Sequence, residues 1–308
     1  MNQNCFVPNL KICLHKRFSE YINLQTNKFP IHVEISPTGY CNAKCPWCFY
    51  KDNQERKILD YDAIIDFISQ LSRNGTDAIS WTGGGEPSLH PNFDEISSFV
   101  FWETNLAQGM FTNGLVVTYN PTHFDWIRVS KTDANWPEDN IKKIRQEAKE
   151  VCRVGMCLNY SGQDSEMNDI IEGLRIVHEN DLDYLQIRPW LELGGTITDV
   201  KMPNIKDPKL FMTEYKFDEA KKEKEYTECR GYHFVPFVWE DGEVNACGYQ
   251  RGKNGYILGN IYEESFEKII KKYPKFVKVN NNCQTCCRNH EINKTIDKSL
   301  KIEDRYFV

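Results

Sequence analysis

Residues 31–48, IHVEISPTGYCNAKCPWC, join a short alternating segment to a loop that carries three cysteines. Apolar and polar residues alternate over 31–36, which predicts a β-strand whose two faces have different surroundings. Cysteines follow at positions 41, 45 and 48, with the spacing C-x3-C-x2-C. The stretch therefore predicts a strand that leads directly into a loop rich in thiols.

Strand-like and helix-like segments alternate from residue 31 to residue 190. In one helical segment, Ile64, Ile65, Ile68 and Leu71 share a face, and Asp60 is a candidate N-cap. Alternation of this kind predicts an α/β fold in which helices cross over between parallel strands. It leaves open whether the sheet is flat or curled. The expected strands are 31–36, 78–82, 110–112, 124–130, 153–160 and 184–190, and the expected helices are 61–72, 93–103, 138–150 and 165–180.

The pattern changes after residue 190. Two short apolar segments, 234–239 and 243–247, flank Glu240-Asp241-Gly242, which predicts a β-hairpin, and 265–273 is typical of a short helix. We interpret the charge run at 221–225 as part of a solvated linker. The expected organisation is a lead-in over 1–30, an α/β domain over 31–195, a linker over 196–228, a small α+β domain over 229–290 and a polar, peripheral tail over 291–308.

The composition argues against several classes of protein. The 308-residue chain has a net charge of −6, which disfavours a strongly basic nucleic-acid-binding protein. It has no run of about 18 apolar residues, so we expect no membrane span, and its first residues lack the pattern of a secretory signal. The chain is therefore expected to be cytoplasmic, where its 12 cysteines point to metal or redox chemistry rather than to a disulfide scaffold.

The first thiol group, Cys41, Cys45 and Cys48, has the composition of an incomplete iron–sulfur ligand set. Four thiolates close a [4Fe–4S] cluster, whereas three leave one iron open to an exogenous ligand. The alternatives are a zinc knuckle or three unrelated thiols. Zinc usually takes four ligands, and no nearby His or Cys completes this set, because His32 and His90 are remote in sequence.

Trp47 stands immediately before the third cysteine, and with this residue the loop resembles the signature of the radical S-adenosylmethionine (SAM) superfamily. The resemblance spans 31–190 and implies a partial (β/α)6 TIM-like barrel. It implies that the first thiol group holds a [4Fe–4S] cluster whose open iron binds SAM. An electron from the reduced cluster would then cleave SAM to methionine and a 5′-deoxyadenosyl radical, and the radical would abstract a hydrogen atom from a substrate.

Residues 81–87, WTGGGEP, end the second expected strand and resemble the GGE motif of the same superfamily. The resemblance implies that Gly84 and Gly85, through exposed backbone groups, and Glu86 hold the SAM amino group. A glycine run by itself predicts only a tight turn. This run also lacks the G-x-G-x-x-G spacing of a dinucleotide-binding fold.

The ends of later strands supply further candidates. Residues 128–130 resemble the superfamily segment that contacts the SAM ribose or carboxylate, which makes Ser130 the candidate, although Lys131-Thr132-Asp133 replaces the usual Asp-Gly continuation. In a strand, residues two positions apart lie on the same face. Ser130, Asn159 and Arg188 each share a face with residues that suit the lining of an interior cavity. Each could instead be a polar residue satisfied within a core. The predicted cofactor-binding residues are Trp47, Gly84, Gly85, Glu86, Ser130, Asn159 and Arg188.

The second thiol group, Cys229, Cys247, Cys283 and Cys286, lies near the C-terminus. The first two cysteines, with Gly242, have the spacing C-x12-G-x4-C, and the last two form a C-x2-C pair. Spacing alone leaves open a zinc ribbon or an iron–sulfur cluster. The pattern resembles the twitch form of the SPASM extension of radical SAM enzymes. That resemblance implies one auxiliary [4Fe–4S] cluster on these four cysteines, with Cys287 as a substitute for its neighbour, and a role in electron transfer from a substrate radical.

Cys157 is the remaining cysteine with a candidate catalytic role, because it shares a strand face with Asn159. By resemblance to radical epimerases of the superfamily, its thiol would return a hydrogen atom to a substrate radical. The default interpretation is a buried thiol that packs as a small hydrophobic residue.

Together these features predict a radical SAM oxidoreductase that acts on a small biosynthetic metabolite or on a peptide side chain. We expect an external one-electron reductant of the flavodoxin or ferredoxin type, and no nucleic-acid or membrane partner. Only 30 residues precede the first expected strand, too few for a fused peptide-recognition domain, so a peptide would need a separate partner for its delivery. The alternatives are a redox-neutral epimerase that uses Cys157 and a non-catalytic zinc-binding protein.

Overall fold

The computed structural model describes residues 8–25, 28–48, 50–51, 56–190, 200, 202–212, 216–217, 224–280, 283 and 289–302. Within these ranges, ten strands form one curved sheet, and two further strands form a small separate one. None of the helices in these ranges has the length and apolar character needed to cross a bilayer.

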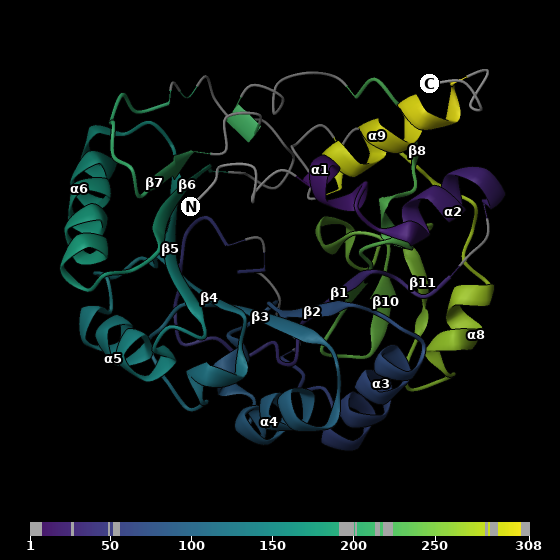
Figure 1. The fold of residues 1–308 in the computed structure, drawn as a ribbon, viewed down its shortest axis with the longest axis horizontal. Helices are drawn as coiled ribbons and strands as arrows, with labels where there is room; N and C mark the ends of the chain where they lie inside the picture. The colour runs from purple at the N-terminus through teal and green to yellow at the C-terminus, as the bar shows by residue number, and fades with distance from the viewer. Residues whose placement is uncertain are drawn as a thin grey trace.

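The central part of the large sheet consists of six parallel strands. They are β1 (His32–Ile35), β2 (Ala78–Trp81), β3 (Ala107–Thr112), β4 (Trp126–Ser130), β5 (Arg153–Tyr160) and β6 (Tyr184–Pro189). The helices between them are α3 (Tyr61–Arg73), α4 (Phe93–Glu103), α5 (Glu138–Ala148) and α6 (Asp164–Glu179). These helices lie on the outer face of the curved sheet (Figure 1). The predicted α/β class with a partial TIM-like barrel is therefore confirmed.

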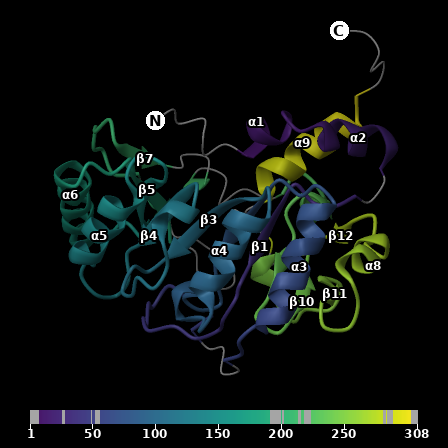
Figure 2. The same cartoon turned by 60° about the horizontal axis from the view of Figure 1, so that its bottom comes forward.

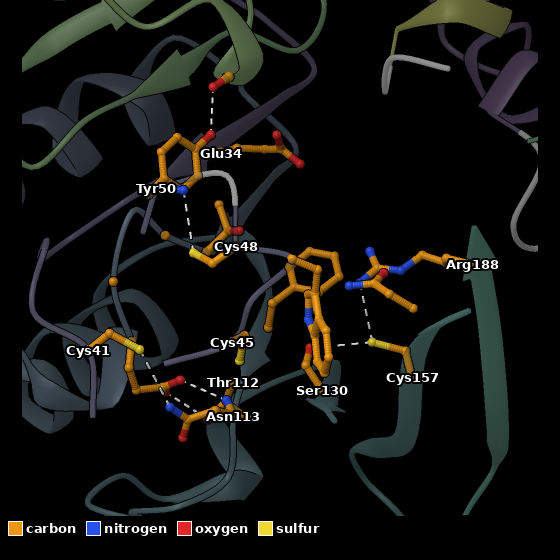
Figure 3. A pocket seen from close by; sticks show the side chains of 18 of the residues that line it. Glu34, Cys41, Cys45, Cys48, Tyr50, Thr112, Asn113, Ser130, Cys157 and Arg188 are labelled. Carbon is orange, nitrogen blue, oxygen red and sulfur yellow. Dashed lines mark hydrogen bonds between the residues drawn. The ribbon is translucent and has the colours of Figure 1, made fainter. Parts of the chain in front are cut away.

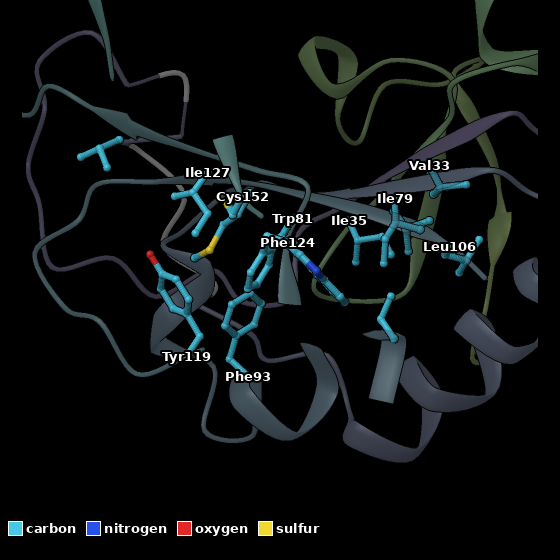
Figure 4. Close-up of a cluster of buried hydrophobic side chains, with 14 of the residues drawn as sticks. Val33, Ile35, Ile79, Trp81, Phe93, Leu106, Tyr119, Phe124, Ile127 and Cys152 are labelled. Atoms are coloured by element: carbon cyan, nitrogen blue, oxygen red, sulfur yellow. The ribbon is translucent and has the colours of Figure 1, made fainter. Parts of the chain in front are cut away.

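The layer between the sheet and the outer helices is apolar, because alternate strand residues point toward the helices (Figure 4). Ile35 of β1 and Trp81 of β2 are fully buried there, and the Trp81 ring packs edge-on against Phe93 of α4, with centroids 5.4 Å apart. Helix α3 begins at a cap in which Asp60 Oδ1 accepts a hydrogen bond from Ala63 N at 3.1 Å. Each large apolar side chain buried in this way contributes about 1.5–3 kcal/mol. This core fixes strands whose opposite face lines the barrel interior.

Two glycines on the interior face make room for aromatic rings of the neighbouring strands. A Cβ atom at Gly109 would lie 2.0 Å from the ring of Trp126, and one at Gly155 would lie 2.2 Å from the ring of Tyr184. The guanidinium of Arg128 lies over both rings, 5.4 Å from each centroid. A cation–aromatic layer therefore crosses the barrel interior. One cavity lies at the carboxyl ends of the strands, and a second, of about 460 Å³, is lined by Gly109, Arg128 and the same two rings.

The sheet continues beyond the six central strands on both sides. Strand β7 (Leu210–Met212) pairs in parallel with β6, within the stretch predicted as a linker. On the other side, β9 (Phe237–Val238) pairs in parallel with β1 and antiparallel with β10 (Glu243–Asn245), which pairs with β11 (Ile257–Asn260). The predicted hairpin is present as β9 and β10, but it extends the barrel sheet instead of forming a sheet of its own.

The small separate sheet joins two distant parts of the C-terminal segment. It pairs β8 (Glu228–Cys229) with β12 (Val277–Lys278). The predicted short helix is observed as α8 (Phe266–Lys271), and its Phe266 ring packs edge-on against Phe67 of α3, with centroids 4.9 Å apart. The C-terminal segment is thus packed onto the outer layer of the barrel as well as onto its sheet.

The prediction of a peripheral tail is wrong for residues 291–300. They belong to α9 (His290–Leu300), which lies beside α1 (Pro8–Ile12) and α2 (Lys16–Leu24) (Figures 1 and 2). Ile292 and Ile296 stand one helical turn apart and are buried in a second apolar core with residues of these helices. Two isoleucines in a polar sequence were too sparse to indicate a buried helix.

Candidate active site

A cavity of about 300 Å³ opens at the carboxyl ends of the barrel strands (Figure 3). The loops after β1, β2 and β4 and the ends of β5 and β6 contribute to its wall. This is the end at which barrels of this type carry their reactive groups. Its lining includes the whole first thiol group together with Trp47 and Glu86. It also includes the predicted residues Gly85, Ser130, Cys157, Asn159 and Arg188, whereas Gly84 lies just outside it.

Backbone amides are aimed at two sulfurs of the first thiol group. Ala43 N donates to Cys41 Sγ at 3.5 Å, and Tyr50 N donates to Cys48 Sγ at 3.4 Å. Hydrogen bonds of this kind stabilise the charged form of a sulfur. Burial acts in the opposite direction and raises the pKa of the Cys45 thiol to about 11. Metal binding must therefore displace a proton from Cys45, where a backbone hydrogen bond from Asp133 favours the thiolate.

The loop that carries these thiols is tied to the loops after two other strands. Asn113, after β3, donates from Nδ2 to Asn42 Oδ1 at 2.7 Å. Asp133, after β4, accepts from Lys44 N through Oδ1 at 3.3 Å. Sequence analysis did not identify Asn113 or Asp133 as site residues, because their roles come from contacts between loops that are far apart in the chain.

The glycine-rich loop after β2 lies in backbone contact with the segment that leads into Cys41. A Cβ atom at Gly85 would lie 2.2 Å from Tyr40 O and 2.6 Å from Thr38 O, so a side chain has no room there. Glu86 N donates to Tyr40 O at 2.7 Å. Glycine is therefore required at position 85 because it lets the loop after β2 pack against the loop after β1 at the cavity wall.

The Glu86 carboxylate is engaged by neighbouring loops. It accepts hydrogen bonds from Ser88 Oγ at 2.9 Å, Thr112 Oγ1 at 2.7 Å and Asn113 N at 2.7 Å. Burial raises its pKa, and these hydrogen bonds oppose that effect. The side chain thus fixes the loop after β2 to the loop after β3. A direct role toward a SAM amino group stays a prediction.

Three predicted residues meet on the adjacent strands β4, β5 and β6 (Figure 3). Ser130 Oγ lies 3.3 Å from Cys157 Sγ, and Arg188 Nη2 donates to the same sulfur at 3.4 Å. Arg188 Nε is buried and has no hydrogen-bond partner among the described residues. The structure therefore gathers the polar side chains that strand alternation had placed on one face, around the thiol of Cys157.

The second thiol group is assembled from separate elements. Cys229 ends β8, Cys247 precedes the 3-10 turn Gly248–Gln250, and Cys283 follows β12, whereas Cys286 lies outside the described residues, as does Cys287. Burial and the adjacent thiols of Cys283, Cys229 and Cys247 together raise the pKa of Tyr256 above its usual range. The three described thiols therefore share one neighbourhood, and Cys247 also lines the cavity of the first thiol group.

The described thiols fit the donor set of iron–sulfur chemistry. Within the residues that the structure describes, no three His, Cys, Asp or Glu side chains surround a position for one metal ion. In a cubane each thiolate binds a different iron, so its ligands stand farther apart than those of a single ion. Three sulfurs on one cavity wall, with amide donors aimed at two of them, suit a cluster that keeps one iron accessible.

Comparison with known proteins identifies the domain that carries the site. Residues 35–184 match the family model of the Radical SAM superfamily, so this stretch of the chain is a Radical SAM domain. No curated protein sequence matches the chain.

Solved structures of similar fold include proteins with bound S-adenosylmethionine. Streptococcus suis SuiB bound to S-adenosylmethionine has 17% identity and a TM-score of 0.61, over 82% of this chain and 68% of SuiB. SuiB bound to its precursor peptide SuiA has 16% identity and a TM-score of 0.63, over 84% of this chain and 69% of SuiB. The protein anSMEcpe with bound AdoMet and the Cp18Cys peptide has 13% identity and a TM-score of 0.52, over 89% of this chain and 84% of anSMEcpe.

Proposed function

We propose that the protein is a radical SAM enzyme whose first thiol group, Cys41, Cys45 and Cys48, holds a [4Fe–4S] cluster with one iron open to SAM. The observation that carries this proposal is the single cavity that brings the three thiols, the glycine-rich loop and the polar strand ends together. The position of this cavity, within the domain that matches the superfamily, supports the assignment.

Held by Cys41, Cys45 and Cys48, a cluster would supply the one-electron chemistry that splits SAM into methionine and a 5′-deoxyadenosyl radical, and this radical would remove a hydrogen atom from the substrate. The chain's own residues bind and orient the reactants. Backbone amides of Ala43 and Tyr50 favour charge on the sulfurs, and the backbone of the glycine-rich loop faces the cavity beside them. For the SAM ribose and carboxylate we propose Ser130, Asn159 and Arg188 as partners, with Trp47 against the ligand.

For the substrate we favour a peptide side chain over a small metabolite. The support is that the similar folds of SuiB and anSMEcpe were solved with the peptides SuiA and Cp18Cys. A radical formed in the cavity has to be shielded from water, and a peptide entering at the carboxyl ends of the strands would supply that cover. The electron would come from a flavodoxin- or ferredoxin-type protein.

We further propose that the second thiol group holds an auxiliary [4Fe–4S] cluster of the twitch type, within a C-terminal region of about residues 229–290. The support is that Tyr256 Oη lies 3.6 Å from Cys283 Sγ, and that the thiols of Cys229 and Cys247 contribute with it to raising the pKa of Tyr256. Because Cys247 also lines the active cavity, this group lies where it could accept the electron of an oxidised substrate radical. Such a role would make the enzyme an oxidoreductase.

A second candidate outcome is epimerisation with Cys157 as the hydrogen donor. The observation in its favour is that the Cys157 thiol lines the cavity between Ser130 and Arg188. In that case the substrate radical would take a hydrogen atom from sulfur, and the substrate would undergo no net oxidation. The thiyl radical left on Cys157 would return to the thiol by taking one electron from the external reductant and one proton. A zinc-binding protein without catalytic activity is the remaining alternative, and iron analysis separates it from both enzymes.

The experiment is an assay of SAM cleavage. Protein reconstituted anaerobically with iron and sulfide is reduced with dithionite in the presence of SAM, and 5′-deoxyadenosine and methionine are measured by mass spectrometry. The proposal predicts both products from the wild-type protein and neither from Cys45→Ser. Wild-type protein that carries iron at the first thiol group yet forms no 5′-deoxyadenosine would contradict it.

A further inference from the structure

A fully buried carboxylate from the C-terminal hairpin lies between the two loops that form the cavity wall. Glu240, in the turn between β9 and β10, has no solvent exposure. A Cβ atom at Gly39 would lie 2.9 Å from Glu240 Oε1, and one at Gly84 would lie 3.3 Å from Oε2. The first glycine precedes Cys41, and the second belongs to the glycine-rich loop. One side chain thus touches both loops from the far end of the sequence.

A serine hydroxyl forms a hydrogen-bond bridge between this carboxylate and the glycine-rich loop. Ser36, which follows β1, donates from Oγ to Glu240 Oε2 at 3.0 Å. Ser36 Oγ in turn accepts from Gly84 N at 2.9 Å. The other acceptor near the hydroxyl, Thr38 O, is farther away at 3.4 Å. Because the charged acceptor is also the nearer one, it orients the hydroxyl so that a lone pair faces the Gly84 amide.

An arginine of the same C-terminal segment forms an ion pair with this carboxylate. Arg251 Nη1 lies 2.6 Å from Glu240 Oε1, and Arg251 Nη2 lies 3.0 Å from Asp241 Oδ2. Its guanidinium stacks over the Trp239 ring at 4.5 Å, and that ring meets the edge of the Tyr50 ring at 4.9 Å. A buried carboxylate without such a partner would lose its charge or destabilise the fold. The ion pair of Glu240 and Arg251 therefore packs against both loops and holds the carboxylate in place between them.

We propose that Glu240, held by Arg251, is a positioning residue for SAM binding, because it sets the Gly84 backbone through Ser36. The inference rests on the proposed function and deepens it. The C-terminal hairpin then shapes the SAM pocket whether or not a second cluster is bound. Sequence analysis saw Glu240 only as part of a hairpin turn, since its partner Ser36 stands 204 positions earlier.

The test compares Ser36→Ala and Glu240→Gln with the control Ser97→Ala. Ser97 is equally buried, and its hydroxyl donates to Asp94 O at 3.0 Å within α4, away from the cavity. The first measurement is hydrogen exchange of the amides at 83–86 in cluster-free protein. We expect about tenfold faster exchange in the first two variants, and wild-type exchange at 83–86 in the control.

The second measurement is the dissociation constant of SAM for reconstituted protein, with iron content determined in parallel. Ser36→Ala and Glu240→Gln should weaken SAM binding about tenfold at unchanged iron content, and the control should bind SAM normally.

Two outcomes separate this inference from the proposed function. If wild-type protein binds SAM, and Ser36→Ala and Glu240→Gln bind it equally well with unchanged exchange at 83–86, the positioning role is wrong and the proposed function stands. If iron-loaded wild-type protein binds no SAM, the proposed function fails and the positioning role fails with it.

Discussion

The two thiol groups differ in how the chain brings their sulfurs together. Cys41, Cys45 and Cys48 belong to one loop after β1, whereas Cys229, Cys247 and Cys283 come from three separate elements. The geometry of the first group is therefore largely local. The second group depends on the β8–β12 pairing and on the packing of α9, where Asn293 Nδ2 donates to Cys229 Sγ at 3.2 Å. The comparison implies that the first group can form from its own loop, whereas the second group forms only when the C-terminal part of the fold is in place.

Removal of the first thiol group should have the largest effect. In C41A/C45A/C48A we expect 5′-deoxyadenosine formation to fall by about a thousandfold or more, because no other thiols present an open iron to SAM. Iron content should fall to about half, since the second group would remain loaded. The control C13A/C152A changes two thiols outside both groups and should retain activity. Normal SAM cleavage by the triple variant would contradict the assignment.

Removal of the second thiol group should uncouple SAM cleavage from product formation. In C229A/C247A/C283A/C286A, SAM cleavage should persist while product formation falls by about a hundredfold, because the substrate radical would lack its electron acceptor. The ratio of 5′-deoxyadenosine to product, measured by mass spectrometry, is the relevant number. Full turnover with unchanged stoichiometry would remove the electron-transfer role and leave this group purely structural.

The substitution Cys157→Ala distinguishes oxidation from epimerisation. If the thiol supplies a hydrogen atom, turnover in D2O should stop placing deuterium in the product, while 5′-deoxyadenosine still forms. The loss of a buried sulfur costs about 1 kcal/mol of stability, so Cys152→Ala, a buried thiol outside the cavity, is the matched control. Product formation by Cys157→Ala at the wild-type rate would exclude the donor role.

The smallest expected effect is an acid sensitivity near the second thiol group. Burial lowers the pKa of His233, which follows Cys229 in the chain, to about 4. The unfolded chain binds a proton on this residue below about pH 6.5, so the folded state loses stability as the pH falls toward 4. Between pH 7 and pH 5 the loss is about 2 kcal/mol. Urea unfolding should show this loss in the wild-type protein, and His233→Gln should reduce it; equal pH dependence in both would refute the contribution.

Much of the barrel could be predicted because its signals are local. The strand alternation at 31–36 and the apolar face of 61–72 needed only neighbouring residues. Strand β7 was missed because three apolar residues within a polar stretch carry too little pattern. The parallel pairing of β9 with β1 was missed for a different reason, since a hairpin sequence does not state which edge it will join.

In the candidate site too, the features with local sequence signals could be predicted and those set by tertiary contacts could not. Strand alternation placed Ser130, Cys157 and Arg188 on suitable faces, and the structure brings these side chains together. The contacts of Asn113 with the first thiol loop and of Glu240 with Ser36 join residues 71 and 204 positions apart. Such contacts are set by the tertiary fold, so no motif in a single sequence could indicate them.

The most direct test of the central claim is electron paramagnetic resonance of the reduced variant that lacks the second thiol group. In this variant the first thiol group is the predicted site of any remaining cluster. An open iron predicts a [4Fe–4S] spectrum whose g values change on addition of SAM, with S-adenosylhomocysteine and buffer as comparisons. A spectrum that SAM leaves unchanged, or a variant that retains no iron–sulfur signal, would contradict the proposal of a three-thiolate cluster that binds SAM.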